Sequence, residues 1–172
     1  LPALTGVNAV ECPTASYWSD QVRSQAVITV TPDVNTLYND PPVQYVEIAN
    51  LDLSGATRDA KYIGADGLPD YSFNWGAAGV ALYRAHNITI RGCEIHANEN
   101  GIFGPSYGSF VRDLADITLD ECTLEDNGYP GADRYHNGYL EAWNLLVQRC
   151  FFGDVADGSK GVGLKLRCIN PV

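Results

Sequence analysis

The segment NITIRGCEIHANENGI, Asn87 to Ile102, decides the fold, because similar segments recur after it at a nearly constant interval. DITLDECTLEDNG follows from Asp116 and NLLVQRCFFGDV from Asn144, so that Cys93, Cys122 and Cys150 occupy one position of a repeat. Repeats of this length are typical of solenoids, in which each repeat contacts its neighbours. The repeat must therefore be interpreted before any single motif.

Alignment on the cysteines produces four columns of apolar residues. Two apolar columns two residues apart are typical of one face of a strand, and the step of three to the cysteine column interrupts that alternation. Polar or small residues at 49–50, 91–92, 120–121 and 148–149 predict a bend there. The columns are Val46, Ile88, Ile117 and Leu145; Ile48, Ile90, Leu119 and Val147; Leu51, Cys93, Cys122 and Cys150; and Leu53, Ile95, Leu124 and Phe152.

Each repeat adds a third apolar segment after a variable loop: GVALY at Gly79, GIFG at Gly101, GYLEA at Gly138 and GLKLR at Gly163. A coil of three short strands cannot bury its own apolar face, so it must stack on the next coil about 4.8 Å away. The sequence therefore predicts an all-β protein, a single-stranded right-handed parallel β-helix with long inter-strand loops. AVITV, Ala26 to Val30, reads as a strand of an earlier coil, and SYWSDQVRSQ as a short helix or loop covering the N-terminal end.

The length of 172 residues fits one domain, 1–172, with an N-terminal coil and capping region at 1–42 and recognisable coils at 43–172. The absence of methionine and the ending LRCINPV suggest a processed chain or part of a longer one. The net charge of −10 argues against nucleic acid and anionic membrane surfaces as partners. Eight of the eleven basic residues follow Val80, so an anion site is expected in the later part.

Metal and cofactor chemistry has weak support in this sequence. The three repeated cysteines are interpreted as interior apolar residues, because their column lacks a second type of metal ligand. Cys12 and Cys168 can form a disulfide, and His96 beside Glu125 of the next coil can form an acid/base or metal pair. No cofactor motif is present, and the alternative of calcium binding rests on acidic corners at Asp113, Asp116, Asp120, Glu121, Glu125 and Asp126.

NITIRGCEIHANENGI and DITLDECTLEDNG resemble the repeats of the pectate-lyase-like, right-handed parallel β-helix superfamily over about residues 43–167. DRYHNGYLEAWNLLVQRCFFGDVADGSKGVGLKLR is similar to the last coils of bacterial members with a His-Asn pair before one strand and Lys-x-Arg after the next. The superfamily includes polysaccharide lyases, epimerases, glycoside hydrolases and tailspikes. The resemblance implies an extracellular or secreted protein that acts on or contacts polysaccharide.

The best candidate catalytic residues are Lys165, Arg167, His136 and Arg134. Abstraction of the proton beside a uronate carboxylate needs a base, a cation for the developing enolate and a proton donor, and these residues supply the types required. Gly138 and Gly163, aligned as strand openers, predict that Leu140 and Lys165 are neighbours on one face. Lys165 and Arg167 can equally be exposed cations on a strand edge.

Two classes of function remain open. One is a polysaccharide lyase or epimerase acting on uronate-containing glycans, or a binding protein for them. A glycoside hydrolase is less favoured, because Asp120 is isolated in its column and the acid-rich corners are of a kind that is commonly solvated. The other is a non-catalytic structural, filament-forming, adhesin-like or tailspike-like module, which self-associates through open solenoid ends. Aromatic residues in the loops suit either sugar stacking or loop packing. The fold alone does not choose between the two classes.

Overall fold

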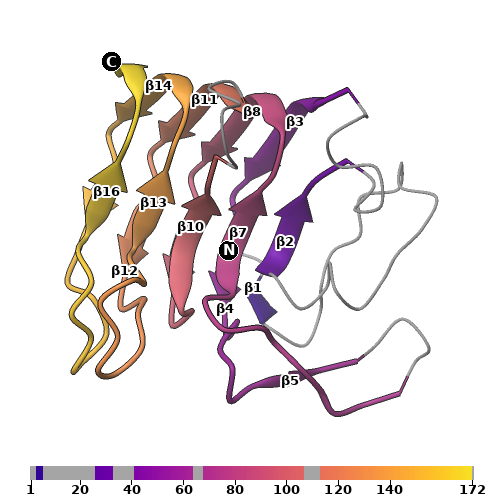
Figure 1. Cartoon of the computed structure of the whole chain (residues 1–172), viewed down its shortest axis with the longest axis vertical. Coiled ribbons are helices and arrows are strands. Elements are labelled where there is room, and N and C mark those ends of the chain that lie inside the picture. The colour runs from indigo at the N-terminus through magenta and orange to yellow at the C-terminus, as the bar shows by residue number, and fades with distance from the viewer. Residues whose placement is uncertain (1–2, 6–25, 33–40, 64–67, 107–112, 172) are drawn as a thin grey trace.

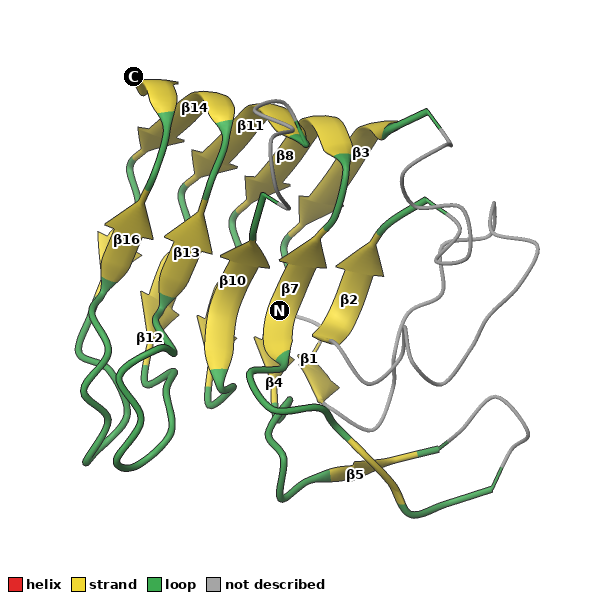
Figure 2. Cartoon of the chain, viewed as in Figure 1, coloured by secondary structure: helices red, strands yellow, loops and turns green. Residues whose placement is uncertain are grey.

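The computed structural model describes residues 3–5, 26–32, 41–63, 68–106 and 113–171, and in these ranges the chain forms strands and no helix. Three parallel sheets surround one core (Figures 1 and 2). Sheet A contains β1 (Ala3–Thr5), β4 (Asp52–Ser54), β9 (Glu94–His96), β12 (Thr123–Glu125) and β15 (Phe151–Phe152). Sheet B contains β2 (Ala26–Val30), β7 (Ala78–Leu82), β10 (Asn100–Gly104), β13 (Gly138–Leu140) and β16 (Leu164–Leu166). Sheet C contains β3 (Val43–Ala49), β8 (Ala85–Arg91), β11 (Leu114–Asp120), β14 (Trp143–Gln148) and β17 (Ile169–Pro171).

Each coil runs through sheet B, sheet C and sheet A in turn before the chain returns to sheet B (Figure 1). The predicted columns are confirmed by the register: Ile117 pairs with both Ile88 and Leu145, and Leu124 pairs with both Ile95 and Phe152. The predicted strand at Ala26 to Val30 is β2, paired with β7. The predicted helix or loop at 16–25 lies outside the described residues.

Two rows of residues with positive φ shape four successive coils. Asn50, Gly92, Glu121 and Arg149, with φ of 53 to 57°, stand at the predicted bend between sheet C and sheet A. A second row, Tyr45, Asn87, Asp116 and Asn144, with φ of 53 to 60°, kinks the strands of sheet C near their start. Asn and Asp tolerate this left-handed conformation better than most residues do. Three of the four residues in the second row, Asn87, Asp116 and Asn144, are therefore of types that tolerate this conformation.

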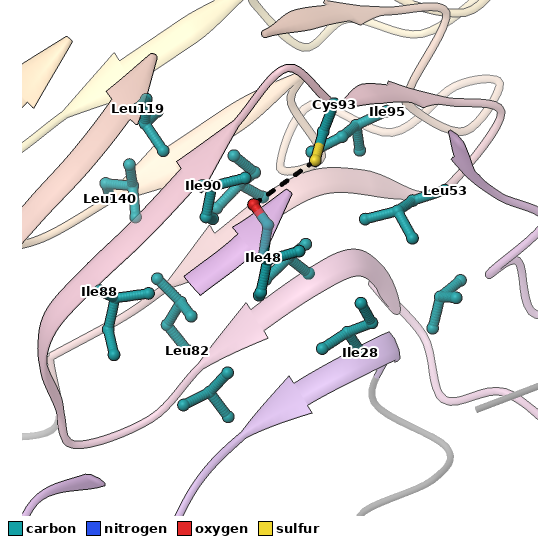
Figure 3. Packing of buried hydrophobic residues seen from close by; sticks show 14 of the residues in the cluster. Ile28, Ile48, Leu53, Leu82, Ile88, Ile90, Cys93, Ile95, Leu119 and Leu140 are labelled. Carbon is teal, nitrogen blue, oxygen red and sulfur yellow. Dashed lines mark hydrogen bonds between the residues drawn. The ribbon is translucent and has the colours of Figure 1, made fainter. Parts of the chain in front are cut away.

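The core is a file of aliphatic side chains that continues from coil to coil (Figure 3). Ile88, Ile95, Ile117 and Leu124 are fully buried, so like side chains stack on like. The cysteine column belongs to this core: the Sγ of Cys93 lies 3.7 Å from the carbonyl oxygen of Ile48 (Figure 3). Cys93, Cys122, Cys150 and Cys168 are all free thiols, and Cys12, the predicted partner of Cys168, lies outside the described residues.

An asparagine ladder lines the corner that follows sheet A. The side-chain amide of Asn98 donates to Oδ1 of Asn127 at 3.0 Å, and that of Asn127 donates to Oδ1 of Asn137 at 3.0 Å. The three side chains are buried and also bond backbone groups of neighbouring coils. Buried amides stacked in this way satisfy the polar groups of a corner that would otherwise be unpaired.

The long insert after β4 contains a short antiparallel hairpin of β5 (Lys61–Tyr62) and β6 (Tyr71–Ser72). Its buried rings, Tyr62 and Phe73, lie 5.0 Å apart between centroids and belong to the main core cluster. The insert therefore contributes to the core through these two rings, while its strand β5 lies beyond the ends of β4 and β7 (Figure 2). In the described part of the chain there is no helix of the length and apolarity needed to cross a bilayer.

One predicted register is wrong. Gly138 pairs with Leu164 rather than with Gly163, so Lys165 stands beside Tyr139 and not beside Leu140. The physical reason is the alternation of the strand: Leu140 is fully buried, and a one-residue shift would turn Lys165 into the core beside it. This correction determines which side chains surround Lys165.

Candidate functional site

The candidate site lies on the outer face of sheet B in its last coils and centres on the ring of Tyr139. Nζ of Lys165 is 5.6 Å from the ring centroid, and Cζ of Arg167 is 5.9 Å from it. Phe103 of the preceding coil stacks on the same ring at 5.7 Å between centroids. Because β10, β13 and β16 are adjacent strands of a packed sheet (Figure 2), the positions of these side chains are defined by a rigid scaffold.

Glu141 connects the groups of this Tyr139 cluster. Its carboxylate accepts hydrogen bonds from the backbone NH of Ser106 at 3.0 Å, from the hydroxyls of Ser106 and Tyr139, and from Nη1 of Arg167 at 3.1 Å. Burial alone raises the pKa of Glu141, but the bonds from Ser106 and Tyr139 and the charge of Arg167 together lower it below its ordinary value. Glu141 is therefore an anion at neutral pH.

Tyr139 remains a phenol in this arrangement. Burial, and then its hydrogen bond to Glu141, raises the pKa of Tyr139 above its ordinary value. The hydroxyl donates to the Glu141 carboxylate and both cations lie within 6 Å of the ring centroid, so Tyr139 contributes a neutral aromatic ring beside them. The local balance at the exposed edge of the cluster is positive, because Glu141 is largely buried and Lys165 and Arg167 share that edge.

His136 lies beneath the cluster as a neutral imidazole. The ring is 3% exposed, stacks on Tyr139 at 6.0 Å between centroids, and accepts a hydrogen bond at Nδ1 from the backbone NH of Val162 at 3.0 Å. Burial, and then the nearby charge of Lys165, lowers the pKa of His136. A nitrogen that accepts a backbone NH is not free to take a proton from a ligand, and the remaining proton is assigned to Nε2.

Arg134 is the one predicted residue that the structure does not bring into this cluster. Its side chain is 90% exposed on the loop between β12 and β13, and its ion pair is with the adjacent Asp133 at 4.0 Å. The direction of the Arg134 side chain could not be predicted from the repeat, because a loop has no strand periodicity. The predicted set therefore divides into Lys165, Arg167 and His136 around Tyr139, and Arg134 apart from them.

A buried ion pair secures the corner that leads to His136. The carboxylate of Glu99 is fully buried and accepts from Nε and Nη2 of Arg58 at 2.6 and 2.7 Å and from the backbone NH of Gly76 at 2.6 Å. Asn100 continues this contact, since its amide donates to the oxygen of Gly76 and its Oδ1 accepts from the NH of His136. The segment that presents His136 is thus tied to two earlier coils.

Aromatic rings surround the guanidinium of Arg58. Its Cζ lies 3.8 Å from the ring centroid of Tyr129, 4.9 Å from that of Trp75 and 5.4 Å from that of Tyr135. The hydrogen bond to Glu99 raises the pKa of Arg58 despite partial desolvation, so the cation persists at all ordinary pH. The contacts of Tyr129 and Tyr135 with Arg58 agree with the expectation that aromatic residues in the loops pack these loops onto the solenoid.

The other predicted polar pairs are arranged differently from the expectation. His96 and Glu125 are register neighbours as predicted, but Nε2 of His96 bonds Oδ1 of Asp52 at 2.9 Å. At the acidic corner proposed for calcium, Asp120 and Glu121 form ion pairs with Arg149 at 2.6 and 2.9 Å. Within the described ranges there is no group of three or more His, Cys, Asp or Glu side chains that could hold a metal ion. The described residues therefore lend the calcium alternative no support.

Tyr139, Glu141 and Ser106 were not anticipated as members of the site. Alternation in GYLEA and GLKLR was sufficient to find the first two, because Tyr139 and Glu141 lie on the same face as Lys165 and Arg167 once the register is corrected. Ser106 reaches Glu141 from the segment that follows β10, a contact that no periodic pattern encodes.

A family model described as "Right handed beta helix region" matches residues 43–159 of this chain. This match spans more than half of the sequence, and the chain belongs to that family. Searches of curated proteins and of solved structures found no match. The match covers the strands from β3 to β15, and membership of the family leaves the choice of ligand to the side chains on the outer faces of the coils.

Proposed function

We propose that this member of the right-handed beta helix family binds an acidic polysaccharide through the Tyr139 cluster. The supporting observation is the pair of cations, Lys165 and Arg167, that lie 5.6 and 5.9 Å from the centroid of one aromatic ring, Tyr139, on an outer sheet face. An aromatic ring packs against the apolar face of a pyranose, and ammonium and guanidinium groups bind its carboxylate. Arg167 is 65% exposed, so its guanidinium can bind a ligand carboxylate while Nη1 holds Glu141.

Binding is supported better than bond cleavage. A lyase or epimerase needs a base near the proton beside the uronate carboxylate. His136 is buried with Nδ1 occupied, and Tyr139 and Arg167 both donate hydrogen bonds to Glu141, so Lys165 is the remaining base in the cluster. Elimination or epimerisation is accordingly the narrower form of the proposal, with Lys165 as base and Arg167 as the clamp of the carboxylate.

Affinity electrophoresis in gels containing polygalacturonate, alginate or neutral dextran tests the binding proposal. Retardation by the polyuronates alone is expected, and it should weaken as salt is raised. The double variant Lys165→Ala, Arg167→Ala should lose at least tenfold in affinity, because each cation makes a charge-assisted contact. Arg134→Ala is the matched control, since it removes an exposed cation outside the cluster. Equal retardation of the double variant and the wild type would refute the proposal.

A second assay separates binding from catalysis. Incubation with the same polyuronates should release unsaturated product, followed by its ultraviolet absorbance, if Lys165 acts as a base. Lys165→Arg keeps a positive charge but cannot act as a base near neutral pH, so it should retain binding and lose all product. Absence of product from the wild type leaves the binding function and rejects the lyase form.

One observation favours a structural module as the second candidate. The last coil, with β15, β16 and β17, ends all three sheets and exposes Phe151, Leu166 and Ile169 by 58, 38 and 42%. Strand edges with exposed apolar residues are templates for pairing with another chain. Self-association through this end of the solenoid should appear as a concentration-dependent mass in light scattering, and Leu166→Lys should reduce it. A monomer at all concentrations argues against this candidate.

A further inference from the structure

A groove of about 700 Å³ runs over the outer face of sheet C, away from the Tyr139 cluster on sheet B. Residues of β3, β8, β11 and β14 line it, so it crosses four consecutive coils. Figure 1 shows these four strands side by side along the solenoid axis. The groove is therefore elongated in the direction of stacking and is built on regular strands rather than on loops.

The kinked positions of sheet C form one row of the groove. Tyr45, Asn87, Asp116 and Asn144 all have positive φ, and the strand register places them opposite one another. Each kink directs the strand away from a flat path, and the kinks lie in register. Tyr45 is 80% exposed at the N-terminal end of this row, and its ring is a stacking surface.

A second row, two residues further along each strand, consists of Glu47, Thr89, Thr118 and Leu146 and supplies hydroxyl groups in its two middle coils. Thr89 pairs in register with Glu47 on one side and with Thr118 on the other. The side chains of Thr89, Thr118 and Asn87 make no hydrogen bond within the described part of the chain, although they are in the groove. Polar groups on a rigid sheet without internal partners are available to a ligand.

The charges of the groove select against an anionic ligand. Among the described residues that line it, the acids are Glu47 and Asp116 and no Lys, Arg or His is present. Glu47 is paired with Arg91, and Asp116 accepts a hydrogen bond from the amide of Asn144 at 2.9 Å. The remaining chemistry consists of hydroxyls, amides and one exposed ring, the groups that bind hydroxyl-rich neutral molecules.

We infer that the sheet C groove binds an extended neutral polysaccharide that lies along the solenoid axis. The two middle coils present equivalent hydroxyls, Thr89 and Thr118, on strands about 4.8 Å apart, a distance close to the length of one pyranose unit in an extended chain. Thr89 and Thr118 then bond hydroxyls of successive sugars, and Tyr45 stacks on a sugar ring at one end. The inference is independent of the acidic-polysaccharide site, which uses a different sheet and opposite charge.

Affinity electrophoresis of the full chain with hydroxyethyl cellulose or glucomannan tests the inference, with dextran as a neutral polymer of different shape. Retardation by the extended β-linked polymers, insensitive to salt, is expected. Thr89→Val, Thr118→Val should reduce affinity about five- to tenfold by removing two hydroxyls while keeping β-branched side chains on the strands. Tyr45→Ala should reduce it by a similar factor.

Thr123→Val on sheet A is the matched control, because it removes an outer-face hydroxyl from β12, outside the groove. It should bind as the wild type does, and the thermal midpoints of all variants should agree. The inference is overturned if no extended neutral polymer retards the wild type, if the double variant binds equally well, or if Thr123→Val causes the same loss. Lys165→Ala, Arg167→Ala should leave neutral binding unchanged, so failure here and failure at the acidic site are distinguishable.

Discussion

Removal of the middle rung of the asparagine ladder should destabilise the whole solenoid. Asn127 is fully buried; its amide donates to the oxygens of Ile95 and Glu125 and to Oδ1 of Asn137 at 2.8 to 3.0 Å. Its Oδ1 accepts from the backbone NH and the side-chain amide of Asn98 at 3.2 and 3.0 Å. Asn127→Ala therefore deletes five hydrogen bonds, one local bond to Glu125 and four that connect the corner after β12 to neighbouring coils.

The expected loss in the free energy of unfolding is about 3 to 5 kcal/mol, from roughly 1 kcal/mol per bond with some relief if water enters the space. Urea denaturation followed by tryptophan fluorescence measures this loss as a shift of the midpoint at constant slope. Asn74→Ala, at an exposed position, is the control and should change stability by less than about 0.5 kcal/mol. A loss below about 1 kcal/mol for Asn127→Ala would show that the ladder does not hold the coils together.

Three further results are expected. Gly161→Ala should lower the thermal midpoint and perturb the candidate site, because its Cβ would lie 1.8 Å from the carbonyl oxygen of Tyr135 and 3.3 Å from Nδ1 of His136; an unchanged midpoint contradicts the close approach. The lowered pKa of His136 means that the unfolded chain binds its proton more readily, so stability should fall as pH drops below about 6.5, and His136→Asn should flatten that part of the profile. Because the pKa of Glu141 is lowered in the folded protein, its ionised carboxylate contributes to stability above the ordinary pKa of a glutamate, about 4.3, and this contribution is lost as pH falls through the lowered pKa. The difference in stability between wild type and Glu141→Gln should therefore close on acidification. A difference that is constant with pH argues against an ionised Glu141.

The coils could be predicted from the sequence because their stacking imposes a periodic requirement on every inward position. Ile88, Ile117 and Leu145 must be apolar in each coil, so the columns are visible without a structure. The register between β13 and β16 of sheet B was harder to predict, because Gly138 and Gly163 both precede a strand but do not pair with each other. The buried Leu140, which pairs with Leu166 rather than with Lys165, was the stronger signal for the register, and glycine was the weaker one.

The candidate site was predictable where it lies on strands and not where it depends on loops. Lys165 and Arg167 were found by residue type, and the structure places both beside Tyr139. Arg134 belongs to a loop, where no periodicity constrains direction. Likewise, Asn98 and Asn127 share a repeat position, but the third rung of the ladder, Asn137, comes from a different part of its coil.

The separation between core and outer face explains how one solenoid can present two surfaces of opposite chemistry. Inward side chains such as Ile95 and Leu124 are fully buried and carry the stacking energy, so outward positions are free to differ between sheets. On sheet B they are aromatic and basic around Tyr139, and on sheet C they are hydroxyls and acids around Thr89. Substitutions on either outer face should therefore change binding with little change in stability, and the two faces should respond independently because no described contact joins Thr89 to Tyr139.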